Sequence, residues 1–163
     1  AQRAFMGPDA KKRKKSIKNN LYLIPGIKDD ICGKRLVVID DSTIRGNNSA
    51  LVKKLLYDKC GVKEAYLLNY TPQIGIIGSD GIPRGCEFGV DMPPKENRNH
   101  KFIARGRNIK EISDIIGMPT RFISVQGMLD VFRSFGVMER ELCTFCIGGQ
   151  HPFNDLETRV FGV

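Results

Sequence analysis

The sequence has no segment that would direct it into a membrane or out of the cell. None of its apolar runs is long enough to span a bilayer, and its first residues show no signal-peptide pattern. The five cysteines are an odd number without secretory context, so we do not expect a disulfide framework. Internal repeats and an initiator Met are also lacking. These absences predict a cytoplasmic protein, about one domain of 163 residues, that looks like part of a longer chain.

Acidic residues are scarce in only one part of the chain. Residues 1–35 hold ten Lys or Arg and three Asp or Glu, a net charge of +7, whereas the other 128 residues hold sixteen and fifteen, a net charge of +1. The basic run at 11–15 is compatible with nucleic acid and equally with a polyphosphate substrate, because both are dense anions. The positive charge is therefore a local feature and not a property of the whole surface.

Apolar patterning predicts a strand–helix–strand unit over residues 36–70. Residues 36–39 form a short buried-strand pattern, residues 48–60 have helical spacing that Gly61 is expected to end, and residues 62–70 resemble a buried parallel strand. Such a unit builds a doubly wound α/β sheet. A Gly-rich loop follows at 71–88. Helical spacing returns at 109–116 and at 128–135, with a short strand expected at 122–125.

Two adjacent carboxylates, Asp40 and Asp41, stand where the first strand should end, and a small polar turn leads from them into the helix. Ligands of open α/β sheets bind outside the carboxyl ends of the strands. A helix N-terminus offers free N–H groups and a positive dipole end to a phosphate. Paired carboxylates suit sugar hydroxyls or a hydrated magnesium ion. The stretch therefore predicts a site for a phosphorylated sugar.

The run VVIDDSTIRGNNS at residues 37–49 resembles the motif that binds 5-phosphoribosyl-1-pyrophosphate (PRPP) in the type I phosphoribosyltransferases. It is most similar to the VVLVDDSIVRGTTS form of the amidophosphoribosyltransferases. Two Asn replace two Thr of that form, so two hydroxyl contacts are lost. The resemblance implies a magnesium site at Asp40 and Asp41. It also implies that PRPP is bound by Asp40, Asp41, Ser42, Thr43, Ile44, Arg45, Gly46, Asn47, Asn48 and Ser49.

The resemblance continues on both sides of this motif. Residues 3–21 are similar to the family's mobile loop that closes over PRPP and the short helix after it, which implies a tentative catalytic role for Arg3 and Lys15. The family's version of the loop at 71–88 is shorter. By resemblance, residues 1–135 are the second half of a phosphoribosyltransferase domain, with the PRPP-binding unit at 35–70, and residues 136–163 are a cysteine-containing tail.

Cys143 and Cys146 form a CxxC pair, a spacing found in zinc, redox and iron–sulfur sites. Cys86 lies in the run CEFGVD. In the iron–sulfur members of the family, cysteines at these three positions hold a [4Fe–4S] cluster, and the fourth ligand comes from upstream. The resemblance therefore implies a cluster at Cys86, Cys143 and Cys146. A Zn²⁺ site that adds His151, and three reduced thiols without metal, remain alternatives.

The resemblance implies an incomplete type I phosphoribosyltransferase fold, Rossmann-like, with a mostly parallel sheet flanked by helices. The activity implied is transfer of the phosphoribosyl group of PRPP to glutamine-derived ammonia, the first step of purine biosynthesis. The family's glutaminase portion, an N-terminal domain, is not in this sequence. A homo-oligomer is expected, and neither a membrane nor nucleic acid is an expected partner. The competing interpretation is a non-catalytic purine regulator that senses PRPP and binds DNA.

Overall fold

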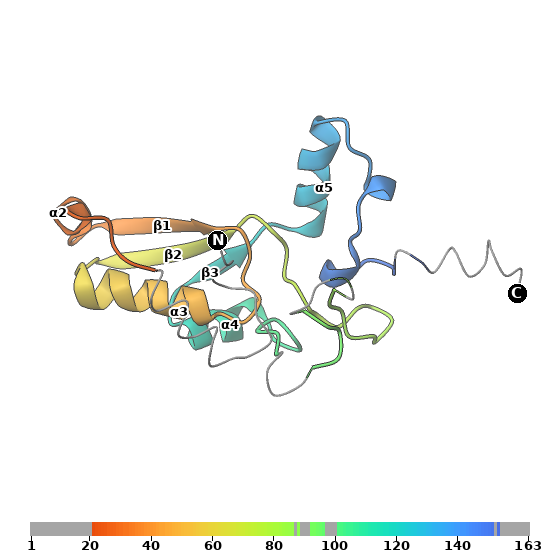
Figure 1. Cartoon of the computed structure of the whole chain (residues 1–163), viewed down its shortest axis with the longest axis horizontal. Coiled ribbons are helices and arrows are strands. Elements are labelled where there is room, and N and C mark those ends of the chain that lie inside the picture. The colour runs from red at the N-terminus through yellow and green to blue at the C-terminus, as the bar shows by residue number, and fades with distance from the viewer. Residues whose placement is uncertain (1–20, 87, 89–91, 97–100, 152, 154–163) are drawn as a thin grey trace, which may run out of the picture.

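The computed structural model describes residues 21–86, 88, 92–96, 101–151 and 153 (Figure 1). The elements alternate between helix and strand along the chain. They are α2 (Ile27–Ile31), β1 (Arg35–Asp40), α3 (Asn47–Lys54), a π-helical turn (Leu55–Lys59), β2 (Glu64–Asn69), α4 (Ile109–Ile116), β3 (Thr120–Phe122), α5 (Val125–Ser134) and two 3₁₀ turns (Glu139–Glu141 and Phe145–Ile147). Within the part described, no helix is long and apolar enough to cross a membrane.

The three strands form one parallel sheet in the order β1-β2-β3. Asp40, the last residue of β1, is in register with Asn69, the last residue of β2. The α/β class and the strand–helix–strand unit predicted from the sequence are therefore confirmed. Because all three strands run the same way, their carboxyl ends meet at one edge of the sheet, beyond which α5 stands (Figure 1).

One face of the sheet is covered by α3, the π-helical turn and α4, which lie on the same side of the strands in Figure 1. Leu67 of β2 is 1% exposed and Ile112 of α4 is fully buried. Both belong to the main core cluster, against which Leu36 and Val38 of β1 also pack. We call this side the covered face. It contains the hydrophobic core expected from the helical spacing of residues 48–60 and 109–116.

The opposite face presents apolar side chains to solvent. Val37 and Ile39 of β1 are 59% and 71% exposed, and Tyr66 and Leu68 of β2 are 37% and 39% exposed. These residues alternate with the buried ones because successive side chains of a strand point to opposite sides. The prediction that both strands are buried is therefore wrong for this side, which we call the uncovered face.

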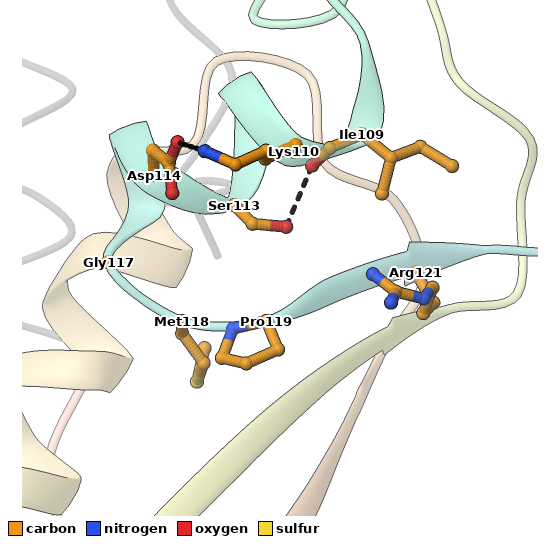
Figure 2. A pocket seen from close by; sticks show the side chains of 8 residues that line it. All are labelled: Ile109, Lys110, Ser113, Asp114, Gly117, Met118, Pro119 and Arg121. Carbon is orange, nitrogen blue, oxygen red and sulfur yellow. Dashed lines mark hydrogen bonds and ion pairs between the residues drawn. The ribbon is translucent and has the colours of Figure 1, made fainter.

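A pocket of about 770 Å³ lies beside the amino end of β3 (Figure 2). Its wall includes Met118 and Pro119, which precede β3, and Arg121 within the strand. The other wall comes from α4, where Lys110 and Asp114 form an exposed ion pair of 3.0 Å. None of the residues predicted to bind a ligand lines this pocket, which lies at β3, separated by β2 from the strand that ends at Asp40.

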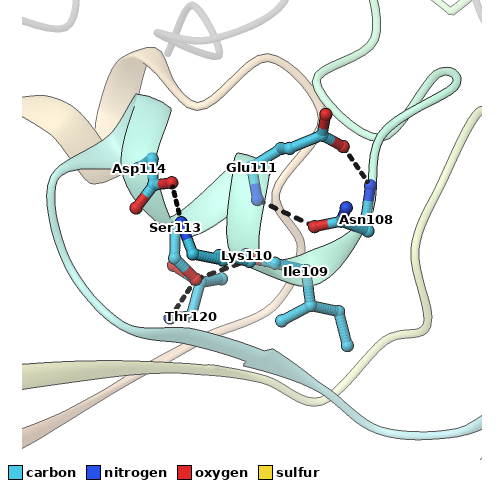
Figure 3. Close-up of polar contacts among 7 residues, drawn as sticks. All are labelled: Asn108, Ile109, Lys110, Glu111, Ser113, Asp114 and Thr120. Atoms are coloured by element: carbon cyan, nitrogen blue, oxygen red, sulfur yellow. Dashed lines mark hydrogen bonds and ion pairs between the residues drawn. The ribbon is translucent and has the colours of Figure 1, made fainter.

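The boundaries of α4 are set by local hydrogen bonds (Figure 3). The side chain of Asn108 accepts a hydrogen bond from the Glu111 N–H, and the Glu111 carboxylate accepts one from the Asn108 N–H, which is a capping box. Gly117 ends the helix with φ of 75°. Ser113 Oγ then accepts a hydrogen bond of 3.0 Å from the N–H of Thr120 and so fixes the start of β3.

Two elements differ from the sequence-based expectation. The third strand is Thr120–Phe122 and not 122–125, because Ser124 Oγ accepts the N–H of Gly127 and starts α5 at Val125. The short helix α2 was not predicted. It has five residues, and its only apolar spacing is the pair Ile27 and Ile31, which is too short a pattern to identify a helix.

Candidate functional site

The loop from Asp40 to Ser49 connects the carboxyl end of β1 to the first turn of α3. It turns at Gly46, whose φ of 75° is a conformation that residues with a Cβ rarely adopt. A Cβ at this position would also lie 2.6 Å from Cδ1 of the buried Ile103. The Arg-Gly step of the motif therefore has a structural reason, because only glycine enters the helix at this angle without strain.

The N-terminus of α3 has the features of an anion site. The N–H groups of Asn47, Asn48 and Ser49 lie in the first helical turn and have no acceptor within the helix. Gly46 occupies the cap position, so no side chain caps them. The helix dipole adds partial positive charge at the same point. A phosphate group placed here would accept these hydrogen bonds, as the sequence predicts.

The two carboxylates that precede the turn differ in burial. Asp40 is half-buried and accepts a hydrogen bond of 3.0 Å from the Asp41 N–H, while Asp41 is exposed and accepts one of 2.6 Å from the Ser42 N–H. Burial raises the pKa of Asp40, and the neighbouring charge of Asp41 raises it further. A cation bound between the two would remove this repulsion, so the pair is chemically suited to a hydrated divalent ion.

Two hydroxyls of the loop are buried and point into the protein. Thr43 Oγ1 donates a 2.7 Å hydrogen bond to Oδ1 of Asn69 and lies 3.4 Å from Ser49 Oγ. Asn69 is 4% exposed and donates from Nδ2 to the carbonyl of Arg121. In this structure Thr43 and Ser49 therefore fasten the loop to β2, which leaves their backbone N–H groups as the ligand contacts they can offer.

Asn69 is a site residue that the sequence reasoning missed. It anchors the loop from the neighbouring strand and stands level with Asp40 across the sheet. A sequence pattern could have identified it, because Asn69 is a polar residue at the end of the apolar run of β2. Asp40 has the same position at the end of β1. Parallel strands place such residues together at one sheet edge.

The structure joins the chain segments that contain the three predicted cysteine ligands. Burial raises the pKa of the Cys146 thiol, and the neighbouring thiols of Cys86 and Cys143 raise it further. The Gly75 N–H donates a 2.8 Å hydrogen bond to the carbonyl of Cys146, which joins the tail to the loop after β2. Among the residues described, however, no three His, Cys, Asp or Glu side chains are close enough together to hold a metal ion.

His151, the additional ligand of the zinc interpretation, packs between aromatic rings. Its ring centroid is 5.0 Å from that of Phe145 and 5.8 Å from that of Phe153. Nδ1 accepts a hydrogen bond from the Phe153 N–H at 3.2 Å. That nitrogen is therefore engaged by the backbone. Arg3 and Lys15, for which the resemblance implies a catalytic role, lie outside the described residues.

Comparison with known proteins confirms the resemblance seen in the sequence. The chain is 31% identical over 151 residues to the amidophosphoribosyltransferase of Methanothermobacter thermautotrophicus, across 92% of this chain and 28% of that protein. It is 30% identical over 159 residues to the chloroplastic amidophosphoribosyltransferase 2 of Arabidopsis thaliana, across 97% of this chain and 25% of that protein. The Bacillus subtilis amidophosphoribosyltransferase is 28% identical over 152 residues, across 92% of this chain and 29% of that protein.

These similarities extend along nearly the whole chain but cover only part of each relative. The chain spans between about a quarter and three tenths of the length of these curated relatives. No model of a protein family matches the sequence. The relatives named here are all enzymes of one kind, and they give no support to the interpretation as a DNA-binding regulator.

Proposed function

We propose that this chain is a part of an amidophosphoribosyltransferase and that it binds the ribose 5-phosphate portion of PRPP. The observation that supports this most directly is the loop from Asp40 to Ser49, where two carboxylates at the end of β1 lead into an uncapped helix N-terminus. The relatives' names support the same enzyme. Residues 1–135 would be the second half of the phosphoribosyltransferase domain, and residues 136–163 its tail.

In this proposal each part of the loop has a separate task. The N–H groups of Asn47, Asn48 and Ser49 hold the 5′-phosphate, because they face outward from the first turn of α3 without helical acceptors. Asp40 and Asp41 accept hydrogen bonds from the ribose hydroxyls. Asn69, through Thr43, keeps the loop in place before substrate arrives. This preorganisation reduces the entropy that binding must overcome.

The proposed reaction displaces pyrophosphate from the anomeric carbon. The bond from that carbon to the pyrophosphate oxygen breaks, a bond to the nitrogen of ammonia forms, and the nitrogen loses one proton to give 5-phosphoribosylamine. A magnesium ion bound with the substrate would neutralise charge on the departing pyrophosphate. The protein's part is to position PRPP and to exclude water. Glutamine would supply the ammonia through the glutaminase portion of the complete enzyme, and the role proposed for Arg3 and Lys15 rests on resemblance alone.

Cys86, Cys143 and Cys146 are proposed to supply three thiolate ligands of a [4Fe–4S] cluster, with a fourth ligand from elsewhere in the complete protein. Thiolates are the usual ligands of such clusters, so the chemistry of the three side chains fits. A contact between their segments supports a shared site, because Nη2 of Arg84, two residues before Cys86, reaches the Gly148 carbonyl, two residues after Cys146. The cluster would join the tail to the loop after β2 and would have no electron-transfer role in the reaction.

The experiment is a calorimetric titration of the complete polypeptide with PRPP and Mg²⁺. We expect Asp40→Asn and Asp41→Asn each to weaken binding by about 10–100-fold, because each removes a charged hydrogen-bond acceptor. Asp130→Asn is the matched control. It removes an exposed carboxylate of α5 that pairs with Arg133 and lies outside the loop. Unchanged affinity in both loop variants, or equal weakening in the control, would contradict the proposal.

A further inference from the structure

The segment between residues 75 and 86 folds into a closed hairpin next to the cysteine site. The Gly78 N–H donates to the carbonyl of Ile82 at 2.9 Å, and Ile77 pairs with Pro83 in an antiparallel bridge. Asp80 Oδ1 accepts the Ile82 N–H at 2.9 Å and closes the turn. The hairpin therefore has its own hydrogen bonds and can present a side chain in a fixed position.

Arg84 is buried at the base of this hairpin, with 3% of the residue exposed. Its Nη2 donates a 2.8 Å hydrogen bond to Asp80 Oδ2 within the hairpin and reaches the Gly148 carbonyl of the tail at 3.5 Å. The guanidinium also lies over the ring of Phe145, with its central carbon 5.0 Å from the ring centroid. One side chain therefore contacts both the hairpin and the tail.

The surrounding backbone leaves room for this arginine. A Cβ at Gly78 would lie 2.4 Å from Nη2 of Arg84 and 2.7 Å from Oδ1 of Asp80. A Cβ at Gly85 would lie 2.6 Å from the backbone nitrogen of Pro94. The glycines allow the hairpin, the following segment and the ion pair of Arg84 with Asp80 to pack at distances that other residues would prevent.

The burial of Arg84 is not fully compensated. Its Nε is buried and has no hydrogen-bond partner in the structure. A buried donor without an acceptor costs about 1–3 kcal/mol of stability. Such groups are uncommon in folded proteins and require an explanation beyond stability. The position of Arg84 relative to the three cysteines offers one.

Arg84 connects the two chain segments that contain the cysteines. It lies two residues before Cys86, and the ring it covers belongs to Phe145, the neighbour of Cys146. The carbonyl of Arg84 also accepts a hydrogen bond from Nη2 of Arg105, which in turn donates from Nε to the carbonyl of Gly75. Loss of the arginine would thus remove contacts that join the segment before Cys86 to the tail.

We propose that Arg84 is a positioning residue that fixes the hairpin segment ending at Cys86 to the tail segment that contains Cys143 and Cys146. Asp80 is its partner, because the hydrogen bond from Arg84 both orients the guanidinium and lowers the pKa of that carboxyl. This inference rests on the proposed function, in which the three thiols bind a cluster. It adds a residue outside the ligand set and assigns a purpose to the Gly-rich hairpin.

The test measures the cysteine geometry in the complete, metal-free polypeptide. A short bifunctional thiol reagent is applied to the Cys143→Ser background, and cross-linking of Cys86 to Cys146 is followed by peptide mass spectrometry. We expect Arg84→Gln to slow this cross-linking by about tenfold or more, because small displacements have large effects on reactions between positioned groups. Arg84→Lys should lose less, since it keeps the charge but not the planar fork. Arg133→Gln, an exposed arginine of α5, is the matched control.

Two other cysteines separate a positioning effect from loss of the fold. Cys60 is fully buried, so its alkylation reports unfolding, while the exposed Cys32 reports reagent activity. Slow cross-linking in Arg84→Gln with unchanged labelling of Cys60 and Cys32 supports the proposal. Equal cross-linking rates in wild type and Arg84→Gln overturn it. The proposal is also overturned if cross-linking slows only when Cys60 becomes labelled and Asp80→Asn cross-links at the wild-type rate.

A second measurement distinguishes a failure of this positioning role from a failure of the proposed cluster. The complete protein is purified without oxygen, and iron and sulfide are counted in wild type, Arg84→Gln and Cys143→Ser. We expect Arg84→Gln to weaken iron binding by about 10–100-fold, the usual effect of an outer partner of a metal site. If the wild type binds no iron, the cluster fails. Cross-linking that still depends on Arg84 would then support the positioning role alone.

Discussion

The two faces of the sheet have similar apolar side chains but different surroundings. On the covered face Leu67 and Ala65 are 1% and 0% exposed, while on the uncovered face Val37 and Ile39 of the neighbouring strand are 59% and 71% exposed. Parallel strands that are apolar on both sides are typical of sheets with helices on both faces. In the described part of this chain, helices cover only one of the two faces.

The difference between the two faces is tested most directly by replacing one isoleucine with alanine on each face. Ile112→Ala removes a fully buried side chain beneath the covered face, so we expect a loss of about 2–5 kcal/mol in the free energy of unfolding. Ile39→Ala removes one that is 71% exposed, with an expected loss of about 1 kcal/mol or less from strand propensity. Urea denaturation of this 163-residue chain measures both. Equal losses would mean that the uncovered face is buried in solution.

Polar groups provide a second, smaller contrast between the faces. Asn69→Leu leaves the buried hydroxyl of Thr43 without its 2.7 Å acceptor and should cost about 1–3 kcal/mol. On the uncovered face, Glu64→Gln breaks a 3.7 Å ion pair with the exposed Arg35 and should cost about 0–1 kcal/mol. Denaturant midpoints at fixed salt compare the two. A larger effect from Glu64→Gln would contradict the assignment of buried and exposed faces.

The smallest expected effect concerns the two carboxylates at the end of β1. Burial raises the pKa of Asp40 above its unfolded value, so this carboxyl stabilises the fold at low pH, and the contribution is lost as pH rises through its folded pKa. Asp40→Asn should therefore raise the melting temperature slightly at pH 7 in the absence of ligand, and the gain over wild type should vanish below the ordinary Asp pKa of about 3.9. Thermal melts across pH measure this, with the exposed Asp41→Asn as comparison. A lower melting temperature for Asp40→Asn at pH 7 would show that the charged form is stabilised instead.

The sequence predicted much of the fold because the relevant signals are local. The spacing of Ile109, Ile112 and Ile116 predicted α4, and the apolar runs predicted β1 and β2. The error in β3 has a local cause as well, since Ser124 could belong either to a strand or to a helix cap until its hydrogen bond to Gly127 was known. Arg84 was not predicted at all, because an arginine in a Gly-rich loop usually extends into solvent.

The sequence alone determined the local features of the loop from Asp40 to Ser49, whereas its attachment to Asn69 came from the fold. Its carboxylates, its glycine with positive φ and its helix N-terminus lie within ten consecutive residues, so short-range hydrogen bonds and backbone sterics specify them. Only the tertiary structure decided the rest. The contact of Arg84 with Gly148, its burial against Phe145, and the exposure of one sheet face depend on which distant segments pack together. Burial is a property of neighbours in space, and a residue's position in the sequence does not reveal them.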